Sequence, residues 1–235
     1  MALYGPGFQR PPTEDEKKLG IVTAMSPNYM GNPGNMLNYS DSLIANEDNC
    51  SFWLTGLPPD VTVHELLSSI RDCGRIFAMH INREAINVGN YHMGAGAKLV
   101  FMTKAGATNF YNRYVRTRSM CIRGWVPRIC RNRIKVREQS GVANYKSRCL
   151  RITGPADVVN PAFLIPWLEE RLVFQVDEII MHPSYCNTSV MEIRFSSFRS
   201  QANFAFMAMI RSQEFRELPN FFVRWVRDPC DATYR

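Results

Sequence analysis

The chain has 235 residues, of which 46% are hydrophobic and 21% charged, and its formal net charge is +7. This composition is typical of globular proteins and excludes wholesale disorder and collagen-like repeats. The longest apolar runs, such as 205–210, fall far short of the ~18 residues that a membrane-spanning helix needs, so we expect no membrane association. The N-terminus lacks the hydrophobic core of a signal peptide, which predicts a protein of the nucleus or the cytoplasm.

The seven cysteines are odd in number, and no two of them have the CxxC spacing of a metal site. Reduced thiols in a reducing compartment therefore explain them best, and we expect no metal. The sequence also contains no GxxxxGK[ST], GxSxG or HExxH motif and no zinc-deaminase signature. It therefore predicts no catalytic residues, no cofactor and no small-molecule substrate.

Positive charge gathers in the middle of the chain. Residues 49–138 carry 14 basic and 5 acidic side chains (net +9), whereas 1–48 have a net charge of −3 and 139–235 of +1. Nine basic residues between positions 113 and 137 are interrupted by no acid. Because like charges repel one another, such a run indicates a polyanionic partner, with nucleic acid favoured over a nuclear-import signal or simple solubility. The nine are Arg113, Arg116, Arg118, Arg123, Arg128, Arg131, Arg133, Lys135 and Arg137.

In chain order, residues 1–48 are rich in Pro, Gly, Asn and Ser, which predicts a flexible tail. A period of two then alternates with a period of 3.6. Thr62 and Glu65 have capping-box spacing before the apolar positions of a helix. The predicted elements are strand 50–56, a helix from Thr62, strand 75–81, a polar loop over 82–93, strand 96–102, helix 104–115 and strand 124–134.

The same order recurs in the second half of the chain. LTGLPPD (54–60) is echoed by ITGPADV (152–158), 98 residues later. The predicted elements are strand 148–153, a helix over 161–172 that could also begin at Pro166, strands 176–181 and 190–196, helix 198–211 and strand 221–226. This repeat predicts an α+β protein of two tandem βαββαβ, ferredoxin-like domains, over 49–138 and 148–235, joined by a linker at 139–147.

The segments WLTGLPPDVTVHELLSSIRDCGRIFA, AKLVF and NRIKV resemble the RNA-recognition motif (RRM), particularly in proteins of filamentous fungi. The resemblance covers 50–137 well and 148–230 weakly. It implies a four-stranded antiparallel sheet, backed by two helices, whose open face binds single-stranded RNA through aromatic residues on strands one and three.

This resemblance places Trp53 at the position where the family stacks a base. Alternation agrees, because Phe52 and Leu54 would face the helices while Trp53 and Thr55 point outward. On strand three the segment GAGAKLVF (94–101) has Gly96 and Lys98 where the family has aromatics, so two stacking platforms are missing.

We therefore expect non-catalytic binding of single-stranded RNA by the first domain. Trp53 would stack a base, Asn132 could read a base edge, and the basic side chains would contact phosphates. In the second domain Arg151 takes the stacking position, and Glu192 would repel phosphate unless it pairs with Arg151 across the strands. That domain is expected to contact a protein partner, and the alternative for the whole chain is a protein-interaction scaffold without RNA binding. The predicted RNA-binding residues are Trp53, Thr55, Lys98, Arg128, Asn132, Arg131, Arg133, Lys135 and Arg137.

Overall fold

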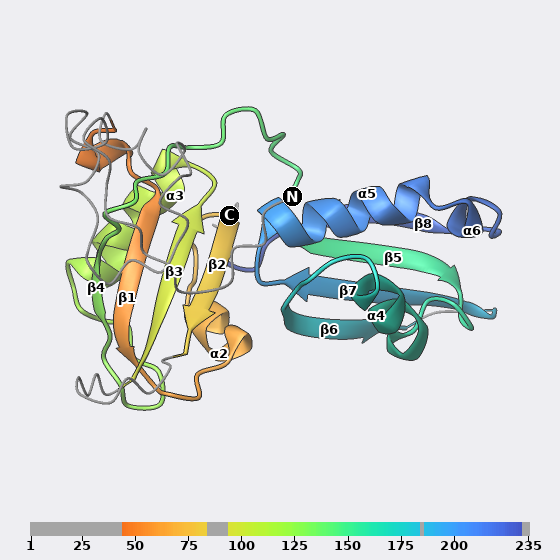
Figure 1. Ribbon diagram of the computed structural model, residues 1–235, viewed down its shortest axis with the longest axis horizontal. Helices are drawn as coiled ribbons and strands as arrows, with labels where there is room; N and C mark the ends of the chain where they lie inside the picture. Colours follow the sequence, from red (N-terminus) through yellow and green to blue (C-terminus); the bar gives the residue numbers. More distant parts are fainter. Residues whose placement is uncertain (1–43, 84–93, 184–185, 232–235) are drawn as a thin grey trace, which may run out of the picture.

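The computed structural model describes residues 44–83, 94–183 and 186–231. These residues form two four-stranded antiparallel sheets, each with its own helices, that lie side by side (Figure 1). We call the part that holds β1 to β4 the first domain and the part that holds β5 to β8 the second domain. The predicted loop over 82–93 and the predicted tail fall mostly outside the described residues. The last residues of that tail are described, and they form a 3-10 helix, η4 (Asn46–Asp48), next to a buried Ile44.

The first domain follows the predicted βαββαβ order. Its sheet has the strand order β2-β3-β1-β4, so β2 and β4 are the edge strands. The helix after β3 continues without interruption into one wider π-helical turn, named η5. The elements are β1 (Ser51–Leu57), α2 (Val63–Ser68), β2 (Ile76–Asn82), β3 (Ala95–Phe101), α3 (Lys104–Phe110), η5 (Tyr111–Val115) and β4 (Arg128–Arg131).

The predicted alternation along β1 is correct. Phe52 and Leu54 are fully buried against the helices, and the ring of Phe52 packs 4.9 Å from that of Phe110 on α3. At the start of α2 the predicted capping box forms, because Thr62 Oγ1 accepts from the Glu65 amide while the Glu65 side chain accepts from the Thr62 amide. These contacts fix the strand register and hold the helices on one face of the sheet.

Strand β4 is much shorter than the predicted 124–134, and local chemistry explains both of its ends. Pro127 precedes it and has no amide hydrogen for the ladder, while Gly124, with φ of +82°, turns the chain just before. At the other end Asn132 Oδ1 accepts from the Ile134 amide, which bends the chain away from the sheet.

The second domain repeats the topology, with the strand order β6-β7-β5-β8. Helix α4 begins at Pro161, capped by Asn160, and keeps Pro166 in its interior, so the alternative start at Pro166 is wrong. A short helix, α6, was not predicted. The elements are β5 (Cys149–Pro155), α4 (Pro161–Glu169), β6 (Val176–His182), β7 (Thr188–Phe195), η6 (Phe198–Ala202), α5 (Asn203–Arg211), α6 (Gln213–Arg216) and β8 (Phe222–Val226).

The second domain packs against edge strand β2 of the first, which lies nearest to it in Figure 1. Ser197 Oγ donates to the Met79 carbonyl at 3.0 Å and accepts from the Met79 amide at 2.9 Å. Asp228 Oδ2 accepts from the Ile76 amide at 2.8 Å. Because these bonds satisfy backbone groups of an edge strand that would otherwise need water, the two domains are fixed to one another.

A buried arginine organises this junction. Arg148 is 1% exposed and donates to Asp228 Oδ1 at 3.0 Å and to Asp177 Oδ2 at 2.7 Å. The other oxygen of Asp177 lies 2.9 Å from Nδ1 of His64, which belongs to α2 of the first domain. His64 is 52% exposed, and this contact links the first domain to the buried arginine of the second.

The segment that joins the domains crosses one end of the first sheet. Its hydrogen bonds reach β1 through Val136 and Cys50, the end of β3 through Gln139 and Met102, and the start of β2 through Ala143, which accepts from Arg75. The segment therefore covers this end of the sheet.

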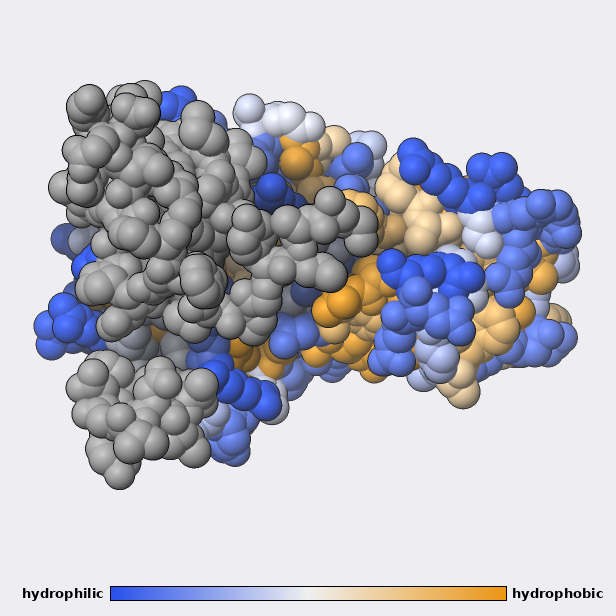
Figure 2. Space-filling model, viewed as in Figure 1, coloured by the Kyte–Doolittle hydropathy of each residue, from blue (hydrophilic) through white to orange (hydrophobic). Residues whose placement is uncertain are grey.

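Among the described helices, none is long and apolar enough to cross a membrane. The visible surface of the second domain, at the right of Figure 2, mixes apolar patches with polar groups.

Candidate nucleic-acid interface

The open face of the first sheet has Trp53 near its middle. Trp53 is half-buried, and its partners across the two neighbouring strands are Lys98 on β3 and Cys130 on β4. Lys98 is in turn paired with His80 on β2. Directly paired side chains lie on the same side of a sheet, so these four residues form one row across all four strands.

Gly96 explains how the indole of Trp53 is seated. A Cβ atom at Gly96 would lie 3.1 Å from Cζ2 and 3.7 Å from Cη2 of Trp53, so a larger residue would push the ring away. The six-membered ring therefore rests over the β3 backbone, with Gly96 as its floor. The resemblance to the RRM family implies that glycine at position 96 loses a platform for base stacking. In the structure, the same glycine leaves the space in which the Trp53 ring lies.

A second row lies beside the first. Asn82 pairs with Gly96, and Thr55 pairs with Arg128. His80, Asn82, Thr55, Arg128 and Cys130 are exposed, while Lys98 is half-buried. Of the eight residues in the two rows, two carry a permanent positive charge and none is acidic. We call this set the Trp53 face, which consists of Trp53, Thr55, His80, Asn82, Gly96, Lys98, Arg128 and Cys130.

Three of the other predicted contacts are engaged within the chain. Arg131 lies on the helix side of β4, where its guanidinium is 4.6 Å from the centre of the Phe52 ring and donates to the Asn49 carbonyl. Burial lowers the pKa of this guanidinium. Lys135 donates to the Ile44 carbonyl, and Asn132 uses its side-chain oxygen for the turn after β4. These contacts stabilise the segment that follows β4.

Arg133 and Arg137 are exposed, but they belong to the segment that crosses the end of the sheet. Two other members of the basic run pair with acids of the same domain, Arg113 with Asp72 at 3.2 Å and Arg123 with Asp60 at 2.8 Å. The structure thus brings Trp53, Thr55, Lys98 and Arg128 together on one face. It distributes the rest of the basic run over other surfaces.

The second sheet has an ion-paired face instead of an aromatic one. Arg151 donates to Glu192 Oε2 at 2.9 Å, as the sequence suggested, and Arg194 donates to Glu192 Oε1 at 2.8 Å. Burial raises the pKa of Glu192, but the hydrogen bonds from the two arginines outweigh it, so the pKa is lowered. The predicted pairing of Glu192 with Arg151 is therefore confirmed, and Arg194 adds a second arginine to the same carboxylate.

All seven cysteines lie within the described residues as free thiols. Four are buried and three, Cys121, Cys130 and Cys186, are exposed. No group of three or more His, Cys, Asp or Glu side chains in the described ranges is arranged to hold a metal ion.

Comparison with known proteins bears on the fold. No protein-family model and no curated protein matches the chain. Among solved structures, RNA-recognition domains 1 and 2 of Sex-lethal from Drosophila melanogaster share 17% identity, and the match covers 76% of this chain and 100% of that one, with a TM-score of 0.28. The first two RRM domains of the yeast poly(U)-binding protein Pub1 share 13% identity over 75% of this chain and 99% of theirs, with a TM-score of 0.29.

The fold is a tandem pair of RRM-like domains. This conclusion follows from the repeated βαββαβ order and from the same strand order in both sheets. The narrower resemblance to proteins of filamentous fungi stays a prediction.

Proposed function

We propose that the chain binds single-stranded RNA, without catalysis, on the Trp53 face of its first domain. The observation that supports this most strongly is Trp53 itself, a large apolar ring on the open side of the sheet, seated on Gly96 and flanked by basic side chains. An aromatic ring in such a place binds bases by stacking, and stacking requires no particular base.

In this proposal each residue of the face has one task. A base stacks on the side of the indole that faces away from Gly96. Lys98 and Arg128 lie on opposite sides of Trp53, on β3 and β4, where they would contact the phosphates before and after that base. The hydroxyl of Thr55 can donate to or accept from a base edge. A single stacking platform predicts modest affinity and little sequence preference.

The direct test is titration of a fluorescent oligouridylate with the full chain and with Trp53→Ala. Because loss of one stacked base costs about 1–3 kcal/mol, affinity should fall roughly 5- to 150-fold. Phe222→Ala is the matched control, since Phe222 is also an exposed aromatic on a sheet but lies on β8. Equal affinity of the Trp53→Ala variant and the unaltered chain would contradict the proposal, provided that circular dichroism shows a folded variant.

The salt dependence of the same titration separates phosphate binding from other contacts. Each neutralised phosphate of a single strand contributes about 0.7 to the slope of log affinity against log salt, so the two phosphates that Lys98 and Arg128 would contact predict a slope of about −1.4. A flat response would favour the second candidate function, a protein-interaction scaffold. The observation that favours this candidate is the ion-paired face of the second sheet, which has Arg151 instead of an aromatic residue at the stacking position.

A further inference from the structure

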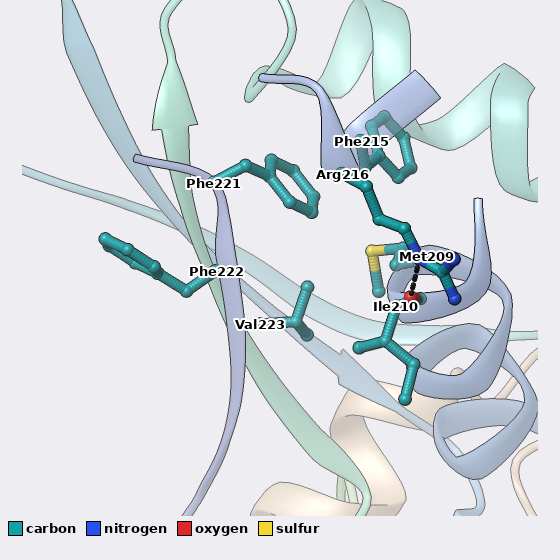
Figure 3. A pocket seen from close by; sticks show the side chains of 7 residues that line it. All are labelled: Met209, Ile210, Phe215, Arg216, Phe221, Phe222 and Val223. Carbon is teal, nitrogen blue, oxygen red and sulfur yellow. Dashed lines mark hydrogen bonds between the residues drawn. The ribbon is translucent and has the colours of Figure 1, made fainter. Parts of the chain in front are cut away.

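The second domain has a hollow between β8 and the helical layer. Its volume is about 300 Å³, and it is lined by Met209 and Ile210 of α5, Phe215 of α6, and Phe221, Phe222 and Val223. Figure 3 shows the side chains of Phe221 and Val223 projecting from one side of the strand towards Met209 and Ile210, while Phe222 projects from the other side.

The walls of this hollow are firmly built, but it remains open to solvent. Phe221 stacks on Phe215 with ring centres 4.5 Å apart and an interplanar angle of 16°. Phe215 is itself buried, whereas Ile210 is 40% exposed and Phe222 is 58% exposed. Large apolar side chains that stay exposed beside a preformed hollow are typical of a binding surface.

Strand β8 is also an edge strand. In the second sheet it pairs with β5 on one side, and no strand of the described residues pairs with it on the other. Every second backbone amide and carbonyl on an edge points outward and can pair with an added strand. Side chains of such a strand would alternate, one entering the hollow beside Ile210 and the next lying over Phe222.

The charge around the hollow is positive. Arg211, Arg216 and Arg224 are exposed, and Arg216 is held at the hollow by a bond from its Nε to the Ile210 carbonyl. Glu214 accepts from Trp167 and Glu217 accepts from Gln213. Both donors are uncharged, so the two carboxylates keep their charge, and the three arginines exceed them by one positive charge. A partner with acidic side chains complements this rim.

We propose that the edge of β8 binds an extended peptide of a partner protein, in which large apolar residues are flanked by acidic ones. The backbone adds a strand to β8, the apolar side chains fill the hollow and cover Phe222, and the acidic flanks pair with Arg216 and Arg224. This mode of recognition takes affinity from backbone hydrogen bonds and selectivity from the side-chain pockets. The site is separate from the Trp53 face and does not depend on RNA binding.

Fluorescence polarisation of labelled synthetic peptides on the full chain tests the proposal. The probe is Glu-Asp-Phe-Ile-Phe-Asp-Glu, and the two control peptides replace either its three apolar residues by alanine or its four acids by lysine. We expect saturable binding of the probe that is at least tenfold tighter than binding of either control. Ile210→Glu should weaken the probe at least tenfold, because it places a carboxylate at the mouth of the hollow.

Trp53→Ala serves as the matched variant and should bind the probe normally, so failure of this proposal and failure of the RNA proposal are distinguishable. No binding of the probe, or equal binding to the Ile210→Glu variant while circular dichroism shows it folded, would overturn the peptide site. Two other occupants are also tested. Displacement of the probe by oligouridylate, with loss of oligouridylate binding in Ile210→Glu, would assign the surface to RNA. Concentration-dependent dimers that Ile210→Glu abolishes would assign it to a second copy of the chain. Either outcome overturns the proposal.

Discussion

Replacement of Arg148 by methionine should destabilise the junction between the two domains. Methionine fills a similar volume but removes the guanidinium that pairs with Asp228 Oδ1 and Asp177 Oδ2. The side chain of Asp228 is 0% exposed, so it would be left as a buried carboxylate. Removing one partner of a buried ion pair typically costs about 3–5 kcal/mol.

The contacts that remain place the expected loss at the lower end of this range. Asp228 would keep the backbone amides of Ile76 and Cys230 as donors, and Asp177 would keep His64. A loss of about 3 kcal/mol corresponds to a decrease in Tm of roughly 6–12 °C for a chain of this length. The loss of stability should not depend on pH near neutrality. Burial lowers the pKa of Arg148, but the surrounding acidic groups, Asp228 foremost, together outweigh burial and hold that pKa above its usual value.

Thermal unfolding followed by circular dichroism measures this change. Arg113→Met is the control, since Arg113 and Asp72 form a pair whose side chains are both 48% exposed, and exposed pairs contribute about 0.2–1 kcal/mol. If Arg148→Met lowers the Tm by no more than Arg113→Met does, the junction does not depend on the buried pair, and the reasoning fails.

Three further predictions concern the first domain. Gly96→Val should leave the Tm within a few degrees but lower RNA affinity at least fivefold in the titration, because its Cβ would displace the Trp53 ring; unchanged affinity would show that the seat is unimportant. Thr62→Ala removes the cap of α2 and should cost about 1 kcal/mol in urea unfolding; an unchanged midpoint would contradict this. Burial raises the pKa of Cys50 to about 11 and of Cys73 to about 12. The free energy of unfolding that these two thiols contribute should therefore be constant below the ordinary thiol pKa of 9.0 and decrease above it. Urea midpoints from pH 7 to 11 check this, and Cys50→Ala should flatten the decrease; a midpoint that stays constant to pH 11 would contradict it.

The sequence predicted the strands of the first domain well where alternation was clear. Phe52 and Leu54 are fully buried on either side of Trp53, so period two alone placed the indole on the open face. The same alternation also predicts on which side of β4 the side chain of Arg131 lies. Since Arg128 and Cys130 face outward, Arg131 must face the helices, as the structure shows. Arg131 was included among the predicted RNA-binding residues because of its charge alone, without regard to the side of the strand on which it lies.

Other features had no local signal. Nothing in the sequence near Arg148 or His64 indicates that Asp177 joins them, because His64 and Asp177 are 113 positions apart. The role of Gly96 depends on the position of one ring on the neighbouring strand. The boundaries of β4 depend on a side-chain hydrogen bond of Asn132. Contacts of this kind are set by the assembled fold, so sequence patterns predict the elements better than they predict the residues that a site uses.

The alkylation rate of Cys130, with and without saturating oligouridylate, tests the central claim most directly. Cys130 is exposed and is the strand partner of Trp53, whereas Cys186, which is also exposed, lies before β7 in the second domain. Mass spectrometry after a short iodoacetamide pulse reports both thiols in the same sample. RNA bound to the Trp53 face should slow the modification of Cys130 at least fivefold and leave Cys186 unchanged. If RNA binds but both thiols react at their free rates, the RNA lies elsewhere on the molecule, and the account of the Trp53 face is wrong.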